Sequence, residues 1–499
     1  AEQAEQAEQA EQASEKERRS RDVAEWMARR EKQFERVQNL PLVTTVKFSG
    51  NERTKPHIID RELEGIRAAR TLRQIAEQAS EASARLEAMD VFEGVYITID
   101  EAPTGAAGPD GVGAAEVTVE LEEKKVRELR MDYFVNGQTV KHGIELKANL
   151  KNAFGYLETF ELDAEVGHEY STKFDAAFRL PQRFSSGGDY DIMARAFHIN
   201  ETQHKYSSFV NRTTGLEASA SAEGHELSYE LSMRELSDPS FRASRLVRRQ
   251  MGTTLKSAVR YTATVDRRDD PMLPTRGWAV QSSTEVAGVG PEGLLRFVRQ
   301  QVEANASVPL GGGAAFTLRA NGGMLLPWGP GWRSRSTCTA DRFFLGGLSH
   351  SLRGFYSKGV GPSDARREPP AGAPRAEAAK DNDDDEDRLD RDALGGDLLA
   401  SLTAHVRLPI RGHELPEKYR IHVHAFAGAG SLVTLTGHGA CTSARDFVRR
   451  TRAACGVGVC IPLSGIVGFE LNYNCSVRAA SPFDKPKHGL QMGFAIGGV

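Results

Sequence analysis

The residue types that most often carry out chemistry are few in this sequence, and their spacing does not suit catalysis. The stretch 347–351, Gly-Leu-Ser-His-Ser, resembles a serine nucleophile elbow but lacks the second glycine and the strand-turn-helix context. His225-Glu226 and His413-Glu414 lack the second histidine of a zinc-binding helix, and His422 and His424 have no third ligand beside them. The sequence therefore predicts no catalytic residue, no metal site and no cofactor, and the protein is not expected to be an enzyme.

The cysteines show no CxxC spacing, so we predict structural thiols rather than a zinc or redox motif. Cys455 and Cys460 lie close in the sequence, but five positions along one extended strand place two side chains on opposite faces. A bridge between them is not expected. The five cysteines are Cys338, Cys441, Cys455, Cys460 and Cys475.

The amino-acid composition excludes some classes of protein and leaves others possible. The chain has 499 residues, 39% of them hydrophobic, and a formal charge of −4 from 64 basic and 68 acidic residues. This balance gives no basic field for nucleic acid, so no nucleic-acid partner is expected. No stretch approaches the ~18 consecutive apolar residues of a membrane-spanning helix. A transmembrane β-barrel is not excluded, because apolar and polar residues alternate along its strands and no long apolar run results.

The first part of the chain divides into a tail and a small domain. Residues 1–39 combine an Ala-Glu-Gln repeat with a charged helix and show no secretory signal, although a removed leader stays open. Residues 40–125 predict a β-α-α-β-β order. Its strands are expected at 43–48, 92–99 and 115–121, and its helices at 55–66 and 71–89.

Beyond residue 140 the chain becomes a series of segments with strict period-two alternation. We count roughly sixteen such segments between 141 and 499, which is more than one β-sandwich domain usually contains. Their polar faces keep charged residues such as Arg260, Arg319 and Arg407 in mid-strand. The pattern favours a closed antiparallel transmembrane β-barrel of roughly 16 strands over residues 140–499.

The most specific motif lies between the later strands, with a second anchor upstream. Residues 266–277 read Asp-Arg-Arg-Asp-Asp-Pro-Met-Leu-Pro-Thr-Arg-Gly. The glycines of the later motif allow positive φ and close approach of the backbone. Its residues are Phe344, Gly346, Gly347, Leu352, Arg353, Gly354, Phe355, Gly361 and Pro362.

Both motifs resemble the BamA-type outer-membrane-protein assembly superfamily, and the small domain resembles its POTRA module. The resemblance implies that Arg353 sits at the tip of a loop inside the barrel and pairs with an acid of a Phe-x-Asp-x-Gly motif. Here the matching stretch, 426–430, reads Phe-Ala-Gly-Ala-Gly, so the acid is absent. Glu470 is on a lumen-facing register and is our substitute. Arg353 is as well explained by locking the loop as by touching substrate.

A single POTRA-like module favours the mitochondrial branch, the core barrel of the sorting and assembly machinery. The resemblance implies an insertase in the mitochondrial outer membrane, with the POTRA-like domain in the intermembrane space. Its implied partners are unfolded β-barrel precursors such as porins, accessory subunits and membrane lipid. A polypeptide-translocating or passive pore of the same superfamily is the alternative, and a soluble β-rich binding protein is a third.

The implied mechanism is a lateral gate between a weakly paired first strand, at about 143–152, and last strand, at about 489–498. Glycines in the last strand suit a weak seam, or else a crowded lumen. The gate residues are Ile144, Leu146, Ala148, Leu150, Gln491, Gly493, Ile496, Gly497 and Gly498.

One insertion interrupts the barrel pattern. Residues 363–397 contain three prolines followed by a dense run of acids, which repels itself. We predict a disordered acidic loop. A second interpretation is that it attracts basic segments of precursors.

Overall fold

The computed structural model of the chain describes residues 42–101, 113–136, 141–167, 171–182, 190–204, 206–290, 295–330, 337–347, 352–368, 390–410, 421–436, 439–463 and 467–496. These residues divide into two compact units. Unit 1 contains chiefly residues 42–127 and 150–159, and unit 2 contains the remainder. The predicted tail at 1–39 lies outside the described residues.

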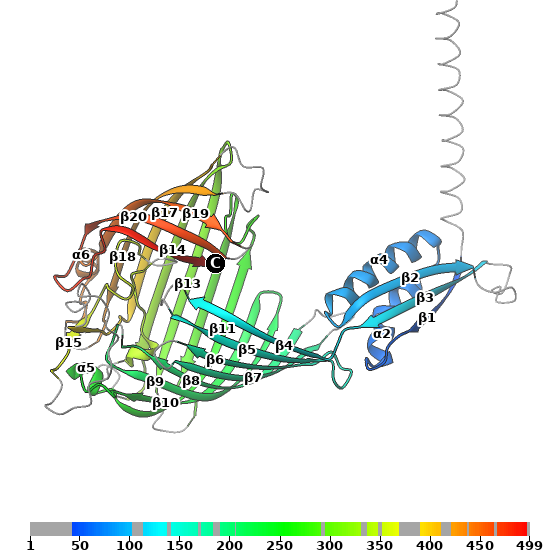
Figure 1. Cartoon of the computed structure of the whole chain (residues 1–499), viewed down its shortest axis with the longest axis horizontal. Helices are drawn as coiled ribbons and strands as arrows, with labels where there is room; N and C mark the ends of the chain where they lie inside the picture. The colour runs from blue at the N-terminus through cyan, green and yellow to red at the C-terminus, as the bar shows by residue number, and fades with distance from the viewer. Residues whose placement is uncertain are drawn as a thin grey trace, which may run out of the picture. The chain divides into compact units, whose positions relative to one another are not determined.

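Unit 1 is a three-stranded sheet covered by helices, in the predicted element order (Figure 1). In the sheet order β1-β3-β2, β1 pairs parallel with β3, and β2 pairs antiparallel with β3. The first predicted helix is divided in two at Leu63. The elements are β1 (Leu42–Ser49), α2 (Pro56–Glu62), α3 (Glu64–Ala68), α4 (Leu72–Ala88), β2 (Phe92–Glu101) and β3 (Gly113–Glu123).

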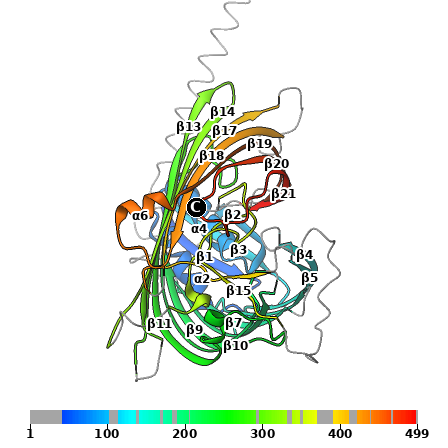
Figure 2. The ribbon, with the colours of Figure 1, turned by 90° about the vertical axis from the view of Figure 1, so that its left-hand side faces the viewer.

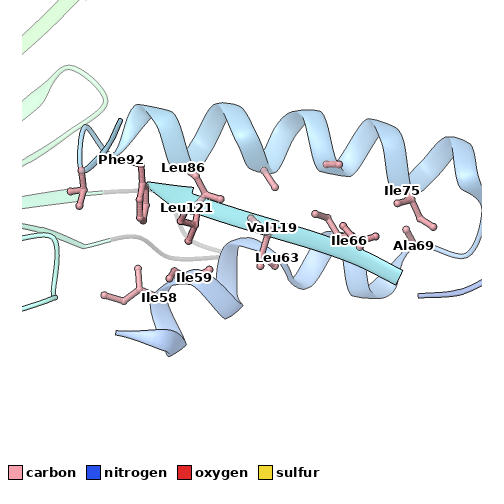
Figure 3. Packing of buried hydrophobic residues seen from close by; sticks show 14 of the residues in the cluster. Ile58, Ile59, Leu63, Ile66, Ala69, Ile75, Leu86, Phe92, Val119 and Leu121 are labelled. Atoms are coloured by element: carbon pink, nitrogen blue, oxygen red, sulfur yellow. The ribbon is translucent and has the colours of Figure 1, made fainter. Parts of the chain in front are cut away.

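The core of unit 1 follows directly from two periodicities (Figure 3). Strand β3 buries every second residue, while α4 buries residues three or four apart, so each element presents one apolar face. Proline at the first turn of α2 and the Thr71 hydroxyl, which accepts a hydrogen bond from the amide of Gln74, start the helices. The buried residues on β3 and α4 are Ala115, Val117, Val119, Leu121, Ile75, Ala79, Ala82 and Leu86.

A turn at residues 152–158 belongs to unit 1, which the sequence did not predict. The Asn152 amide donates to the Thr54 hydroxyl at 2.8 Å, and the Asn152 carbonyl oxygen accepts from the amide of Leu157 at 2.9 Å. Leu157 is 5% exposed and joins the apolar core. These buried contacts attach the turn to the small domain.

Unit 2 is one 16-stranded sheet in which strands that follow one another in the sequence are neighbours (Figure 1). The predicted total of roughly 16 strands is confirmed, but β4 precedes residue 141, so the range 141–499 contains fifteen of these strands. The strands are β4 (Arg127–Asn136), β5 (Lys141–Lys151), β6 (Thr159–Gly167), β7 (Thr172–Gln182), β8 (Tyr190–Thr202), β9 (Val210–Ala222), β10 (His225–Ser237), β11 (Gly252–Asp266), β12 (Gly277–Ala287), β13 (Phe297–Gly311), β14 (Ala314–Pro327), β17 (Leu398–Pro409), β18 (His422–Val433), β19 (Arg452–Pro462), β20 (Val467–Arg478) and β21 (Gly489–Ile496).

Short elements join the later strands. A two-stranded hairpin lies between β14 and β17, and one turn of 3-10 helix precedes it. The elements are α5 (Arg245–Arg248), η3 (Thr339–Asp341), β15 (Ser363–Ala365), β16 (Arg391–Ala393) and α6 (Ala444–Arg449). In the described part of the chain, no helix is long and apolar enough to cross a membrane.

The curled sheet is open along one seam (Figure 2). Within the described residues, β4 has a neighbour only in β5 and β21 only in β20, so both are edge strands. The expected closed barrel is thus corrected to a curled sheet with two free edges.

The turn at residues 266–277 joins β11 to β12, as its motif predicts. The Asp269 carboxylate accepts hydrogen bonds from the amides of Thr275 and Arg276, and the Asp270 carboxylate accepts from the amide of Met272. Burial raises the pKa of Asp269, but these bonds favour its charged form and leave the pKa below its usual value. The acidic residues of this motif therefore build the turn.

Candidate functional site

The Arg-Gly-Phe motif lies on a loop that we call the inner loop, described at residues 337–347 and 352–368. It contacts one face of β13, β14 and β17–β21, which we call the inner face. Leu352 and Phe355 are fully buried there, at 1% and 0% exposure. The structure brings the predicted motif residues together in this loop. They are Phe344, Gly346, Gly347, Leu352, Arg353, Gly354, Phe355, Gly361 and Pro362.

Arg353 is held by a carboxylate, a histidine and an aromatic ring from three strands. Its Nη2 donates to both carboxylate oxygens of Glu470 on β20, at 2.8 and 3.0 Å. Its Nη1 lies 3.2 Å from Nε2 of His405 on β17, and its guanidinium stacks 5.1 Å from the ring centre of Phe426 on β18. The predicted pairing with Glu470 is confirmed. The pair is buried and charge-assisted, which fixes the loop tip in one place.

The glycines of β18 lie against leucine side chains of the inner loop. A Cβ at Gly428 would lie 3.2 Å from Cδ1 of Leu352, and a Cβ at Gly430 would lie 2.9 Å from Cδ2 of Leu345. An acidic side chain in this stretch would therefore compete with the inner loop for space. The Asn472 amide donates to Glu470 at 3.1 Å and orients the carboxylate.

Two glycines of the inner loop are required by its backbone. Gly354 has φ +82°, and a Cβ there would lie 2.8 Å from the Cβ of Ala454 on β19. Gly346 has φ +108°, and its Cβ would lie 2.4 Å from the carbonyl oxygen of Tyr356. Positive φ and lack of space both exclude larger residues, as the sequence predicted.

Three buried ion pairs that the sequence did not reveal fasten loops of unit 2, two of them through arginines of the inner loop. Arg342 contacts Asp397 at 3.3 Å, Arg366 contacts Asp392 at 2.8 Å, and Arg452 contacts Asp484 at 2.9 Å. Each aspartate is 0% exposed at its side chain. Alternation could not identify them, because their partners are distant in the sequence.

The predicted disordered insertion at 363–397 is wrong at both ends. Residues 363–365 and 391–393 pair as β15 and β16. Asp392 accepts from the amide and hydroxyl of Ser208, at 2.7 and 2.8 Å, and from the amide of Ser244 at 2.7 Å. A carboxylate that accepts several hydrogen bonds from the protein can be buried. The middle of the predicted insertion, 369–389, lies outside the described residues.

The strand predicted to form the first side of the gate is the second strand of the sheet and not the edge strand. Ile144, Leu146, Ala148 and Leu150 lie on β5, whereas the edge is β4, which begins at Arg127. Sequence reasoning missed β4 because its alternation starts directly after the small domain. Its apolar face is exposed, with Leu129 at 73%, Met131 at 71% and Tyr133 at 67%.

The predicted last gate strand is β21, at the other edge of the sheet. Gln491 is buried and accepts from the Asn474 amide and, at 3.5 Å, from the amide of Gly354. Gly493 lies opposite Glu470, and Ile496 opposite Val467. Gly497 and Gly498 lie outside the described residues.

The polar groups of the inner face offer no metal site in the part of the chain that is described. His405 and His424 lie with ring centres 6.4 Å apart, and His424 Nε2 is 2.7 Å from the Asn472 carbonyl oxygen. Their contacts join the network around Arg353. The arrangement can hold a loop against a wall and present open strand edges.

Comparison with known proteins assigns the family. The Omp85 superfamily domain matches residues 152–497. The chain belongs to the Omp85 superfamily. This Omp85 chain is similar to the sorting and assembly machinery component 50 homolog of Mus musculus, with 28% identity across 91% of this chain and 90% of that protein. The SAM50-like protein of Schizosaccharomyces pombe is 25% identical across 91% and 90%.

A solved structure supports the fold of this Omp85 chain. The crystal structure of BamA from Haemophilus ducreyi lacking POTRA domains 1–3 has a TM-score of 0.70 and 13% identity, covering 91% of this chain and 84% of that one. The predicted resemblance to the BamA-type superfamily and to the sorting and assembly machinery barrel is confirmed.

Proposed function

We propose that this chain is an outer-membrane assembly factor that folds and inserts β-barrel precursor proteins, and that it acts in the mitochondrial outer membrane. Its Omp85 domain and its similarity to sorting and assembly machinery proteins support this role. Its substrates are unfolded precursors such as porins, and accessory subunits and membrane lipid are its other partners. Unit 1 is a POTRA-like domain on the intermembrane-space side.

The two free edges, β4 and β21, are the observation that carries the proposed mechanism. An edge strand exposes a row of unpaired amides and carbonyls, to which an extended segment adds by backbone hydrogen bonding. A precursor strand pairs with one edge of this lateral gate, and successive strands follow. Backbone pairing is independent of side chains, so one gate serves many precursors. No covalent bond is made or broken.

The inner loop is fixed against the inner face beside this gate. The Arg353–Glu470 pair attaches the loop to β20, and Gln491 connects Gly354 with β21. The loop tip therefore holds β20 and β21 in position, while the outer edge of β21 has no neighbouring strand among the described residues. In this mechanism Arg353 is a positioning residue.

Depletion of the protein tests the function. A radiolabelled porin precursor is imported into isolated mitochondria, and its assembly is followed over time beside a matrix-targeted precursor. We expect assembly of porin to be lost while matrix import continues, because only the outer-membrane step needs the gate. Porin assembly at the normal rate would exclude this function.

A further inference from the structure

Two cysteines face each other across neighbouring strands of unit 2. Cys455 on β19 and Cys475 on β20 are directly opposite in the antiparallel register. Both are exposed and both are free thiols. Opposite residues of an antiparallel pair have Cα atoms about 4.5 or 5.5 Å apart. Both separations fall within the ~4.4–6.8 Å that a disulfide spans.

The remaining cysteines lack such a partner among the described residues. Cys460 is buried on the inner face opposite Glu470, while Cys338 and Cys441 lie outside the strands of the sheet. Cys455 and Cys460 are on opposite faces of β19, as their spacing predicts. The register therefore selects one pair, and it joins two strands rather than two positions of one strand.

The ladder is irregular beside this pair, which helps the thiols to approach. Ala453 is opposite Arg478 but Ala454 is opposite Ser476, so Val477 is an extra residue in β20. A disulfide needs Cβ atoms about 3.8 Å apart, closer than the ~4.5–5.5 Å of most cross-strand pairs. A bulge increases local twist and frees the backbone from ideal spacing.

We propose that Cys455 and Cys475 are a peroxide-sensitive thiol pair that closes a cross-strand disulfide. The sulfur of one thiol attacks hydrogen peroxide, giving a sulfenic acid and one water. The second sulfur attacks the sulfenic sulfur, the S–S bond forms, and the hydroxyl leaves with the second thiol's proton as another water. Two thiols are oxidised by two electrons, and one peroxide is reduced to two waters.

The disulfide would join β19 to β20 on the outer face, opposite the place where the inner loop contacts these strands. On the inner face, a Cβ at Gly354 would lie 2.8 Å from the Cβ of Ala454 and 3.8 Å from the Cβ of Asn474. These two residues are the sequence neighbours of the two cysteines. Oxidation on the outer face therefore links β19 and β20, the two strands that contact Gly354 at the loop tip. Strand β20 is the neighbour of the edge strand β21.

Peptide mapping of the full chain in its native membrane tests this pair. Membranes are treated with hydrogen peroxide, free thiols are blocked with N-ethylmaleimide before unfolding, and the chain is digested without reductant. Trypsin leaves Cys455, Cys460 and Cys475 in one peptide, so a protease that cuts after Glu470 is added. We expect peptides 453–470 and 471–478 to be joined after peroxide and separate after reduction.

Serine variants identify the bridge. The joined peptides should persist in Cys460→Ser, the matched control on the same strand, and disappear in both Cys455→Ser and Cys475→Ser. The proposal is overturned if maleimide still labels Cys455 and Cys475 after peroxide treatment. It is equally overturned if Cys460→Ser abolishes the joined product. Neither readout depends on insertase activity, so the proposed function and this pair stand or fall separately.

Discussion

At the scale of single residues, Arg353 depends on a partner 117 positions away in the sequence. Its side chain is 5% exposed and that of Glu470 is 10% exposed, so neither charge is well hydrated. A buried charge is tolerated only when a partner and hydrogen bonds replace its water. Glu470 on β20 supplies this partner, since the stretch 426–430 on β18 contains no acid.

Removal of the Glu470 charge is predicted to destabilise unit 2. In Glu470→Gln, the Arg353 guanidinium stays buried without a counter-charge, and we expect a loss of roughly 3–5 kcal/mol in the free energy of unfolding. Urea unfolding of the chain in lipid vesicles measures it. Arg212 and Glu235 provide the control, because their side chains are 53% and 48% exposed and 3.9 Å apart. Arg212→Ala should cost at most ~1 kcal/mol, and equal losses would contradict the argument.

Glu123 is predicted to make unit 1 sensitive to acid. Burial raises its pKa, but hydrogen bonds from the Thr54 hydroxyl and the amides of Thr54 and Arg53 outweigh burial and lower the pKa below its usual value. A lowered folded-state pKa stabilises the fold above the unfolded-state pKa of about 4.3. This contribution is lost as the pH falls through the lowered folded-state pKa.

Hydrogen exchange of α4 and β3 in the full chain, corrected for intrinsic rates, measures this effect. Protection should fall with acid in the wild type, and Glu123→Gln should be less protected at neutral pH and change less with acid. Glu122→Gln is the control, since Glu122 is exposed on the same strand. An acid response that survives intact in Glu123→Gln would refute the assignment.

At the scale of elements, one buried carboxylate joins the β15–β16 hairpin to three other segments. Asp392 joins the hairpin to Arg366, to Ser208 after β8 and to Ser244 before α5. The hairpin has three residues in each strand, so its own ladder contributes little. The buried aspartate therefore organises segments that are distant in the sequence.

Asp392→Ala is predicted to loosen this group of loops. It leaves Arg366 and two backbone amides without their acceptor, and we expect a loss of about 3 kcal/mol or more in the free energy of unfolding. Asp390→Ala is the control, because Asp390 is exposed two residues away. Thermal unfolding compares the two variants. A shift for Asp390→Ala as large as that for Asp392→Ala would show that charge alone matters.

At the scale of the whole molecule, the free edges β4 and β21 distinguish an assembly factor from a passive pore. A pore needs a lumen but no open seam, whereas strand addition needs backbone groups without partners. A translocating pore would also keep working with its seam locked.

Capture of a precursor at the edges is predicted. Leu129→Cys on β4 and Leu490→Cys on β21, in a background with Cys455 and Cys475 changed to serine, should form disulfides with a cysteine in the last strand of an arriving porin precursor. Leu231→Cys on the central strand β10 is the matched control, since Leu231 also faces outward. Non-reducing gels detect the products. Equal capture by all three positions would refute strand addition at the seam.

The sequence by itself determined the elements and the motifs. Alternation specified the strands, the 3.6-residue period specified α4, and the glycines of the inner loop marked a tight backbone, because these features depend on neighbours in the chain. It also placed Glu470 on the correct face. These local signals were sufficient to predict a sheet of roughly sixteen strands and a BamA-type resemblance, but they missed β4.

Only the tertiary structure decided which distant residues meet. It confirmed that Glu470 reaches Arg353, buried Asp392 among Ser208, Ser244 and Arg366, and set Cys455 opposite Cys475. It also identified β4 as the edge in place of β5, and left the seam open. Alternation tells which face a side chain takes but not its register with another strand, which depends on packing across the whole sheet.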